Sequence, residues 1–230
     1  MSQTGLELKI AELEESNGRL QNDLARVTDY IAINNLAGRY QFYHQPKTMA
    51  KTFDLFAKKT PGVSVAISGG VEEGLERVRA FWTKRSSIPM EGVMLEHQLT
   101  TPVIEIAADG ETAKGVWMSP GHETVPGLLP GGHWVWGRYA IDFVKEDGEW
   151  KIWHLWYYPS FRTRFNRDWA EGPELPSAAL AQHRAKNPPS GPMPYVNLYT
   201  ADSTRDMVPA PPEPYQQFEA YDPAGNPDGA

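Results

Sequence analysis

The sequence contains no cysteine. Disulfide bonds, thiolate metal sites, iron–sulfur clusters and cysteine nucleophiles are therefore excluded. Basic residues are also few, because 22 Lys and Arg stand against 29 Asp and Glu, which gives a formal net charge of −7. A polyanion such as nucleic acid is not expected as the main partner of an acidic chain. Any chemistry must be carried by histidine and carboxylate side chains.

Long apolar runs and a basic, apolar leader are missing as well. Nowhere do eighteen apolar residues stand together, and the chain begins Met-Ser-Gln-Thr-Gly-Leu-Glu. This pattern predicts neither a transmembrane helix nor a signal peptide, so we expect a cytoplasmic protein with no membrane partner. The 230 residues leave room for one ordinary domain with extensions.

Apolar residues near the N-terminus alternate at spacings of four and three. They are Leu6, Ile10, Leu13, Leu20, Leu24, Val27 and Ile31. This spacing predicts a coiled-coil seam with Leu6 at position d and Asn17 at position a, where a buried asparagine can fix register and oligomer state. We expect a homo-oligomer, dimer or trimer, formed through this helix. The alternative is an amphipathic helix that lies on its own domain.

The rest of the chain reads as helices followed by strands. The first helix either continues past Thr28-Asp29 or restarts there, and it ends before Pro46. A second helix at 48–58, a short strand at 63–67 and a third helix at 71–85 follow. Extended segments then occupy 93–107, 112–119, 133–144 and 150–158, with tight-turn sequences at 108–111 and 146–149. The connection 120–132 is rich in glycine and proline, and we expect a mobile lip there.

Proline marks the C-terminal part, since twelve of the chain's twenty prolines lie between Pro173 and Pro227. Such a segment cannot build a core of its own. Its aromatic residues predict that part of it lies as an extended arm on the body or on a neighbouring subunit; the alternative is a disordered tail. These aromatics are Tyr195, Tyr199, Tyr215, Phe218 and Tyr221. The predicted organisation is a heptad helix (1–27), a central domain (28–169) and a proline-rich arm (170–230).

Three phrases in the central part resemble the SnoaL-like family of the NTF2-like superfamily. They are Ile33-Asn-Asn-Leu-Ala-Gly-Arg-Tyr40 followed by Phe53-Asp-Leu-Phe56, then Ile104-Glu-Ile-Ala-Ala-Asp-Gly-Glu-Thr-Ala113, and Gly137-Arg-Tyr-Ala-Ile-Asp-Phe-Val-Lys-Glu-Asp-Gly-Glu-Trp-Lys-Ile152. The resemblance spans roughly residues 28–164. It implies an α+β cone, in which helices pack on a strongly bent mixed or antiparallel sheet around a deep apolar pocket. Members include polyketide cyclases, scytalone dehydratase and formaldehyde-eliminating lyases, so fold alone does not settle the reaction.

The resemblance also implies where catalytic groups would stand. In dehydratases of the superfamily one histidine sits early in the first long strand and a second His or Asp follows some two dozen residues later, which His97 and His122 match. His44, preceded by Tyr43, replaces the usual aspartate at the end of the first family helix. Imidazoles titrate near neutrality, so one can accept a proton while another group donates one. The alternative for each histidine is a structural role.

Alternation along the third long strand leaves two interpretations open. His133 and Tyr139 point to one face, and Trp136 and Arg138 point to the other, so only one of these sets can line the pocket. On the final strand, alternation groups His154 with Trp150, Ile152, Trp156 and Tyr158. Many aromatic residues suit a flat aromatic substrate, or a well-packed sheet. The expected substrate-binding residues are Tyr40, Trp117, His133, Trp136, Arg138, Tyr139, His154 and Trp156.

No metal and no cofactor are expected, because the chain has no His-x-His, His-x3-His or His-Glu-x-x-His pair. The favoured function is a cofactor-independent lyase, a dehydratase or formaldehyde-eliminating enzyme, acting by acid–base catalysis on a hydrophobic phenolic compound. Two alternatives remain: a non-catalytic subunit or binding module, such as the β-subunit of a ring-hydroxylating oxygenase, and an isomerase or cyclase that uses the same pocket.

Overall fold

A curled mixed sheet forms the centre of the computed structural model, which describes residues 3–67, 69–87, 89, 91–129, 131–172, 174, 177–193 and 195–219. The strand order is β2-β1-β7-β6-β5-β3, and β4 also pairs with β5. The strands are β1 (Ser64–Ala66), β2 (Val71–Glu73), β3 (Met94–His97), β4 (Thr100–Ile106), β5 (Thr112–Thr124), β6 (His133–Glu146) and β7 (Glu149–Arg164). Only β1 and β7 pair in parallel among these strands; the other pairs are antiparallel.

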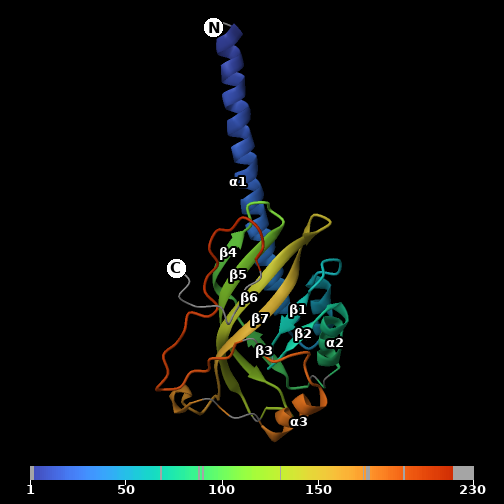
Figure 1. Ribbon diagram of the computed structural model, residues 1–230. Helices are drawn as coiled ribbons and strands as arrows, with labels where there is room; N and C mark the ends of the chain where they lie inside the picture. Colours follow the sequence, from blue (N-terminus) through green and yellow to red (C-terminus); the bar gives the residue numbers. More distant parts are fainter. Residues whose placement is uncertain are drawn as a thin grey trace.

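The concave face of this sheet is covered by α1 (Gln3–Tyr43), η1 (Met49–Leu55) and α2 (Leu75–Ser86) (Figure 1). Helices η2 (Trp169–Glu171) and α3 (Ala178–Lys186) follow β7 and contribute no buried residue to the core. The core lies between the sheet and the last turns of α1, η1 and α2, where Ile33, Tyr40 and Trp82 are fully buried. The α+β cone predicted from the sequence is confirmed. Among the described residues, no helix is both long enough and apolar enough to cross a membrane.

Helix α1 continues without interruption past Thr28 and Asp29, where the sequence left open whether a new helix begins. Asp29 does not cap a new helix. Its carboxylate accepts hydrogen bonds from Trp150 Nε1 and Lys145 Nζ, both at 2.8 Å. Arg26, one turn earlier, donates to the carbonyl oxygen of Ile106 at 3.2 Å. These contacts fix the middle of α1 to the sheet, while its N-terminal half projects away from the body (Figure 1).

Three predicted segments differ from the structure. The helix predicted at 71–85 begins only at Leu75, because residues 71–73 pair with β1 as strand β2 and Gly74 follows with a φ of 88°. The strand predicted at 93–107 is divided into β3 and β4, which share β5 as their neighbour. The lip predicted at 120–132 is shorter, since β5 continues to Thr124 and pairs there with both β3 and β6.

The proline-rich arm lies along the convex face of its own body over residues 195–219. Tyr199 N donates to Ser160 O at 2.8 Å, and Ala108 N donates to Tyr215 O at 3.0 Å. The Phe218 ring lies 4.6 Å from the Trp153 ring. An extended arm on the body, rather than a disordered tail, is therefore found over these residues; Tyr221 lies outside the described residues.

Candidate functional site

Side-chain burial along β6 decides which of the two predicted residue sets lies inside the cone. His133, Val135, Gly137, Tyr139 and Ile141 are buried on this strand, whereas Trp134 and Trp136 are partly exposed. Because successive strand residues point to opposite faces, His133 and Tyr139 face the helices and Arg138 faces outward. On β5 the same alternation sends Trp117 and Glu123 inward, at 1% and 4% exposure.

Six aromatic side chains from five elements meet inside the cone, and we call them the interior cluster. They are Tyr40 and His44 at the end of α1, Trp82 on α2, His97 on β3, Tyr139 on β6 and Tyr157 on β7. The His44 ring lies 5.6 Å from both the Tyr40 ring and the His97 ring, and 5.9 Å from the Trp82 ring. The Tyr139 ring continues the chain, 5.7 Å from Tyr40 and 4.9 Å from Tyr157.

His97 stands at one end of the interior cluster beside a buried carboxylate. Its Nε2 lies 3.5 Å from Glu123 Oε2, and Arg162 Nε lies 2.7 Å from Glu123 Oε1. Gly121 makes this close approach of β3 to β5 feasible, because a Cβ at that position would lie 2.6 Å from Glu96 O and 2.7 Å from His97 Cδ2. A carboxylate at this position can orient the imidazole ring.

Burial sets the protonation states inside the cone. Burial, with smaller contributions from the neighbouring His97 and Arg85, holds the pKa of His44 well below its ordinary value of 6.5, so His44 is neutral at pH 7. Burial likewise raises the pKa of Tyr40, Tyr139 and Tyr157, so their hydroxyls keep their protons and can donate hydrogen bonds. For Glu123, burial raises the pKa, but the neighbouring His97 and the charge of Arg162 outweigh it and hold the pKa below the ordinary value.

Five polar atoms of the interior cluster make no hydrogen bond within the described part of the chain. They are Tyr40 Oη, His44 Nδ1, Trp82 Nε1, His97 Nε2 and Tyr157 Oη, on side chains that are at most 12% exposed. A buried polar group without a partner costs about 1–3 kcal/mol. Such atoms are rare in folded proteins and are often found where a protein binds or transforms a ligand. The interior of the cone therefore holds polar groups whose hydrogen-bonding capacity the described residues leave unused.

His122 does not join His97, contrary to the pairing expected from their spacing. In the β3–β5 register His97 pairs with Gly121, and Glu96 pairs with His122. Because facing residues of paired strands share a face, His97 and His122 point to opposite sides of the sheet. The His122 ring packs on the convex side, 6.1 Å from the Trp134 ring. Its neighbour Glu123 occupies the inward position instead.

A β-bulge in β7 removes His154 from the interior, so the face assigned to it from alternation is wrong. The β6–β7 register shifts between Asp142 and Phe143, where Phe143 pairs with Ile152 and Asp142 pairs with His154. The extra residue turns the following side chains over. His154 Nδ1 therefore lies 2.9 Å from Asp142 Oδ2 on the convex side, with Trp156 stacked on its ring at 5.9 Å. Tyr157 takes the inward direction.

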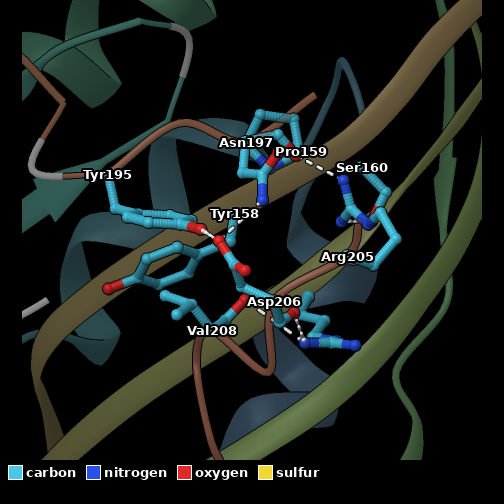
Figure 2. Close-up of a pocket in the computed structure, with 9 residues that line it drawn as sticks. Tyr158, Pro159, Ser160, Tyr195, Asn197, Arg205, Asp206 and Val208 are labelled. Carbon is cyan, nitrogen blue, oxygen red and sulfur yellow. Dashed lines mark hydrogen bonds between the residues drawn. The ribbon is translucent and has the colours of Figure 1, made fainter. Parts of the chain in front are cut away.

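Arg138 and Trp136 also lie outside the interior cluster. Trp136 is 39% exposed and stacks on Phe161. Arg138 donates to Val208 O at 3.3 Å, beneath the arm. The hollow between the arm and the sheet at this point (Figure 2) encloses about 10 Å³, room for about one water molecule. Figure 2 shows Tyr195 and Asn197 turned toward Asp206, which accepts hydrogen bonds from both and so ties the arm to itself.

Three further expected residues are buried or partly buried outside the interior cluster. Trp117 is buried on the concave face and packs edge-on against Phe143, with 6.2 Å between ring centres. His133 is buried, and its Nε2 lies 3.4 Å from Glu174 Oε2. Tyr43 is partly buried and packs against the core. Among the described residues, no group of three or more His, Asp or Glu side chains is placed to hold a metal ion.

Sequence reasoning missed Trp82, Glu123, Tyr157 and Arg162. One signal for Glu123 was present: if Trp117 points inward, alternation carries Ser119, Gly121 and Glu123 inward too. The direction of Tyr157 depends on the bulge, which no residue pattern in β7 announces. Trp82 lies within the helix predicted at 71–85, and no pattern in the sequence marks its indole N–H as a site group.

The comparisons with known proteins agree with this architecture. The family model of the SnoaL-like domain matches residues 25–155. A structure assigned as a scytalone dehydratase from Novosphingobium aromaticivorans is 14% identical over 63% of this chain and 92% of that chain, with a TM-score of 0.51. The hexachlorocyclohexane dehydrochlorinase LinA-type3 from Novosphingobium barchaimii is 14% identical over 67% of this chain and 99% of that chain, with a TM-score of 0.51.

A third similar structure is a protein of unknown function from Mycobacterium tuberculosis, 20% identical over 69% of this chain and 93% of that chain, with a TM-score of 0.50. No curated protein matches the chain. Identities this low show the fold alone, whereas the family model covers more than half of the sequence. The chain belongs to the SnoaL-like family of the NTF2-like superfamily.

Proposed function

We propose that this protein is a cofactor-independent lyase that eliminates water or formaldehyde from a hydrophobic, phenolic small molecule bound inside the cone. The observation that carries the proposal is the set of unpartnered buried atoms in the interior cluster, among them His44 Nδ1, Trp82 Nε1 and Tyr157 Oη. The same cluster contains His97, which lies beside the Glu123 carboxylate. Two similar structures are named as a dehydratase and a dehydrochlorinase, and both names denote eliminations.

His97 is the proposed base. It takes a proton from a carbon or hydroxyl of the substrate, and Glu123 stabilises the imidazolium that forms, from 3.5 Å away. The electron pair left on the substrate forms the new double bond as the leaving oxygen departs. The same proton then passes to that oxygen, so water leaves and His97 is restored. In the formaldehyde-eliminating variant, the proton comes from a terminal hydroxyl and the adjacent carbon–carbon bond breaks to release formaldehyde. The electron pair of that bond forms the new double bond as the benzylic oxygen departs, and the proton passes to this oxygen, which leaves as water.

Tyr157 and His44 are the proposed partners of the leaving oxygen. The raised pKa of Tyr157 makes full proton transfer from its hydroxyl unfavourable, but a hydrogen bond donated to a developing negative charge is favourable. Neutral His44 can donate or accept a hydrogen bond, depending on the tautomer. The resemblance implied catalytic roles for His122 and Tyr43. We assign the role at the leaving oxygen to Tyr157 and His44 instead, because these two side chains lie in the interior cluster.

The aromatic rings of the cluster favour a flat, aromatic substrate. Tyr40, Trp82, Tyr139 and Tyr157 offer ring faces and edges for stacking. Trp117 and His133 extend this lining along β5 and β6. We also propose that copies of the chain associate through α1.

Turnover by the purified chain tests the proposal. Candidate phenolic diols are incubated with the protein alone, and formaldehyde release and loss of water are followed by chemical detection and mass spectrometry. His97→Ala should abolish turnover while the circular dichroism spectrum and melting temperature stay close to those of the parent. His122→Ala is the matched control, because it removes the same ring from the convex face and should leave turnover within about twofold. Near-normal activity of His97→Ala would remove His97 from the mechanism.

A further inference from the structure

The N-terminal half of α1 carries an apolar stripe that the body does not cover. The seam residues Leu6, Ile10, Leu13, Leu20, Leu24, Val27 and Ile31 are 47–67% exposed. They follow the a and d positions of nearly four heptads, with Asn17 as the only polar residue among them. Over this length, from Leu6 to Ile31, the helix extends about 38 Å. A continuous a/d stripe of this extent is typical of a coiled coil.

The body holds α1 by the opposite side of the helix. With Leu24 at a and Val27 at d, Arg26 stands at c and Asp29 at f, and these two residues make the hydrogen bonds to the sheet. The buried residues Ile33, Leu36 and Tyr40 continue the same c and f rows. The a/d stripe therefore stays open even where α1 crosses the sheet, and a second helix can lie along it without meeting the body.

We infer that α1 pairs with α1 of a second copy of this chain as a parallel, two-stranded coiled coil in register at Asn17. Ile10 and Ile31 at a positions with Leu at three of the four d positions are the combination that favours two strands. In a parallel pair, the two Asn17 side chains meet and can hydrogen-bond each other. In an antiparallel pair, Asn17 would instead face apolar d residues and lose a hydrogen bond.

Charges beside the seam support the same direction. Lys9 stands at a g position and Glu14 at the e position of the following heptad, which are neighbours across a parallel pair. Lys9 of one copy can thus meet Glu14 of the other, and the two-fold symmetry repeats the contact. Since each body lies on the c/f side of its own helix, the two bodies project to opposite sides of the coil.

Single-cysteine variants test the direction and register, because the chain has no cysteine of its own. Leu6→Cys and Val27→Cys place one thiol at d positions about 31 Å apart along the helix. In a parallel pair in register, each thiol faces its own copy, so both variants should form a disulfide-linked dimer under mild oxidation. An antiparallel pair brings identical residues together only at its centre and cannot link both. A disulfide at one position only, or at neither, would overturn the inference.

Mass measurement by light scattering tests the number of strands. The parent chain should show twice the mass of 25.8 kDa for one chain; a mass of one or three chains would contradict a two-stranded coil. Leu20→Lys should lower the dimer affinity at least tenfold by placing a charge in the seam. Leu8→Lys is the matched control, because Leu8 is 64% exposed against 65% for Leu20 but stands at an f position. It should remain a dimer, and equal effects of the two substitutions would argue against the seam.

Discussion

Acidification should destabilise this fold through His44. The ring is 2% exposed, and burial holds its pKa well below 6.5 in the folded chain. In the unfolded chain, a histidine titrates near 6.5. Between these two values the unfolded state binds a proton that the folded state does not bind. The stability that depends on neutral His44 is therefore complete above about pH 6.5 and is lost as the pH falls toward the folded pKa.

The size of the effect follows from this linkage. One pH unit below the unfolded pKa, at about pH 5.5, the free energy of unfolding should be lower by about 1.4 kcal/mol than at about pH 7.5. For a chain of this length each kcal/mol corresponds to about 2–4 °C in melting temperature. His44 alone should thus lower the melting temperature by about 3–6 °C between these two pH values.

The assay compares thermal unfolding of the parent and of His44→Phe at the two pH values. Phe keeps an aromatic ring against Tyr40 and Trp82 but does not titrate, and Nδ1 has no hydrogen-bond partner in the described part of the chain. The variant should lose about 3–6 °C less than the parent on acidification, since other titrating groups cancel in the difference. His183→Phe, at an exposed position on α3, should behave like the parent. Equal losses in the parent and His44→Phe would refute the assignment of a neutral, buried His44.

Three further substitutions test the site and the fold. Glu123→Gln keeps the shape of the side chain but removes the charge beside His97, so kcat should fall about 100-fold with little change in KM. Glu123→Asp should recover part of the lost kcat, and an unchanged kcat in Glu123→Gln would contradict the positioning role. Tyr157→Phe removes only a hydroxyl and should lower kcat by about 10–100-fold without lowering the melting temperature, because that hydroxyl has no partner to lose within the described residues. Asp29→Ala leaves Trp150 Nε1 without its acceptor and should lower the free energy of unfolding by about 2 kcal/mol, or the melting temperature by about 4–8 °C. The same substitution at the exposed Asp23 should leave the melting temperature unchanged. Equal losses in the two variants would contradict the role of the Asp29 contacts.

Much of the fold was predictable because its signals are local or periodic. The heptad spacing before residue 32 marks the long first helix. The acidic-glycine turns mark the ends of the long hairpins, and the sequence segments shared with the family mark the elements of the central domain. The places where prediction failed depend on partners distant in the sequence. Residues 71–73 have the composition of a helix start, and only pairing with β1 turns them into a strand.

The site was predictable in its chemistry but less so in its membership. His44 and His97 were identified and the structure brings them together, but His122 was placed with them from spacing along the chain, which does not encode the face of a strand. The face to which a side chain points depends on its alternation along one continuous strand, and β3 pairs with β5 so that His97 shares a face with Gly121. In β7 the alternation itself is interrupted, because the bulge opposite Asp142 adds one residue to β7 and none to β6.

That bulge decides which side chains of β7 face the interior after Ile152. In a regular ladder of the same length, Trp153 would pair with Asp142 and His154 with Ile141, so the two sets of side chains that follow would exchange faces. His154 would then point toward the helices, and Tyr157 would point toward the arm. Deleting Trp153 would instead remove the extra residue together with the bulge, so His154 would still pair with Asp142 and Tyr157 would stay inside.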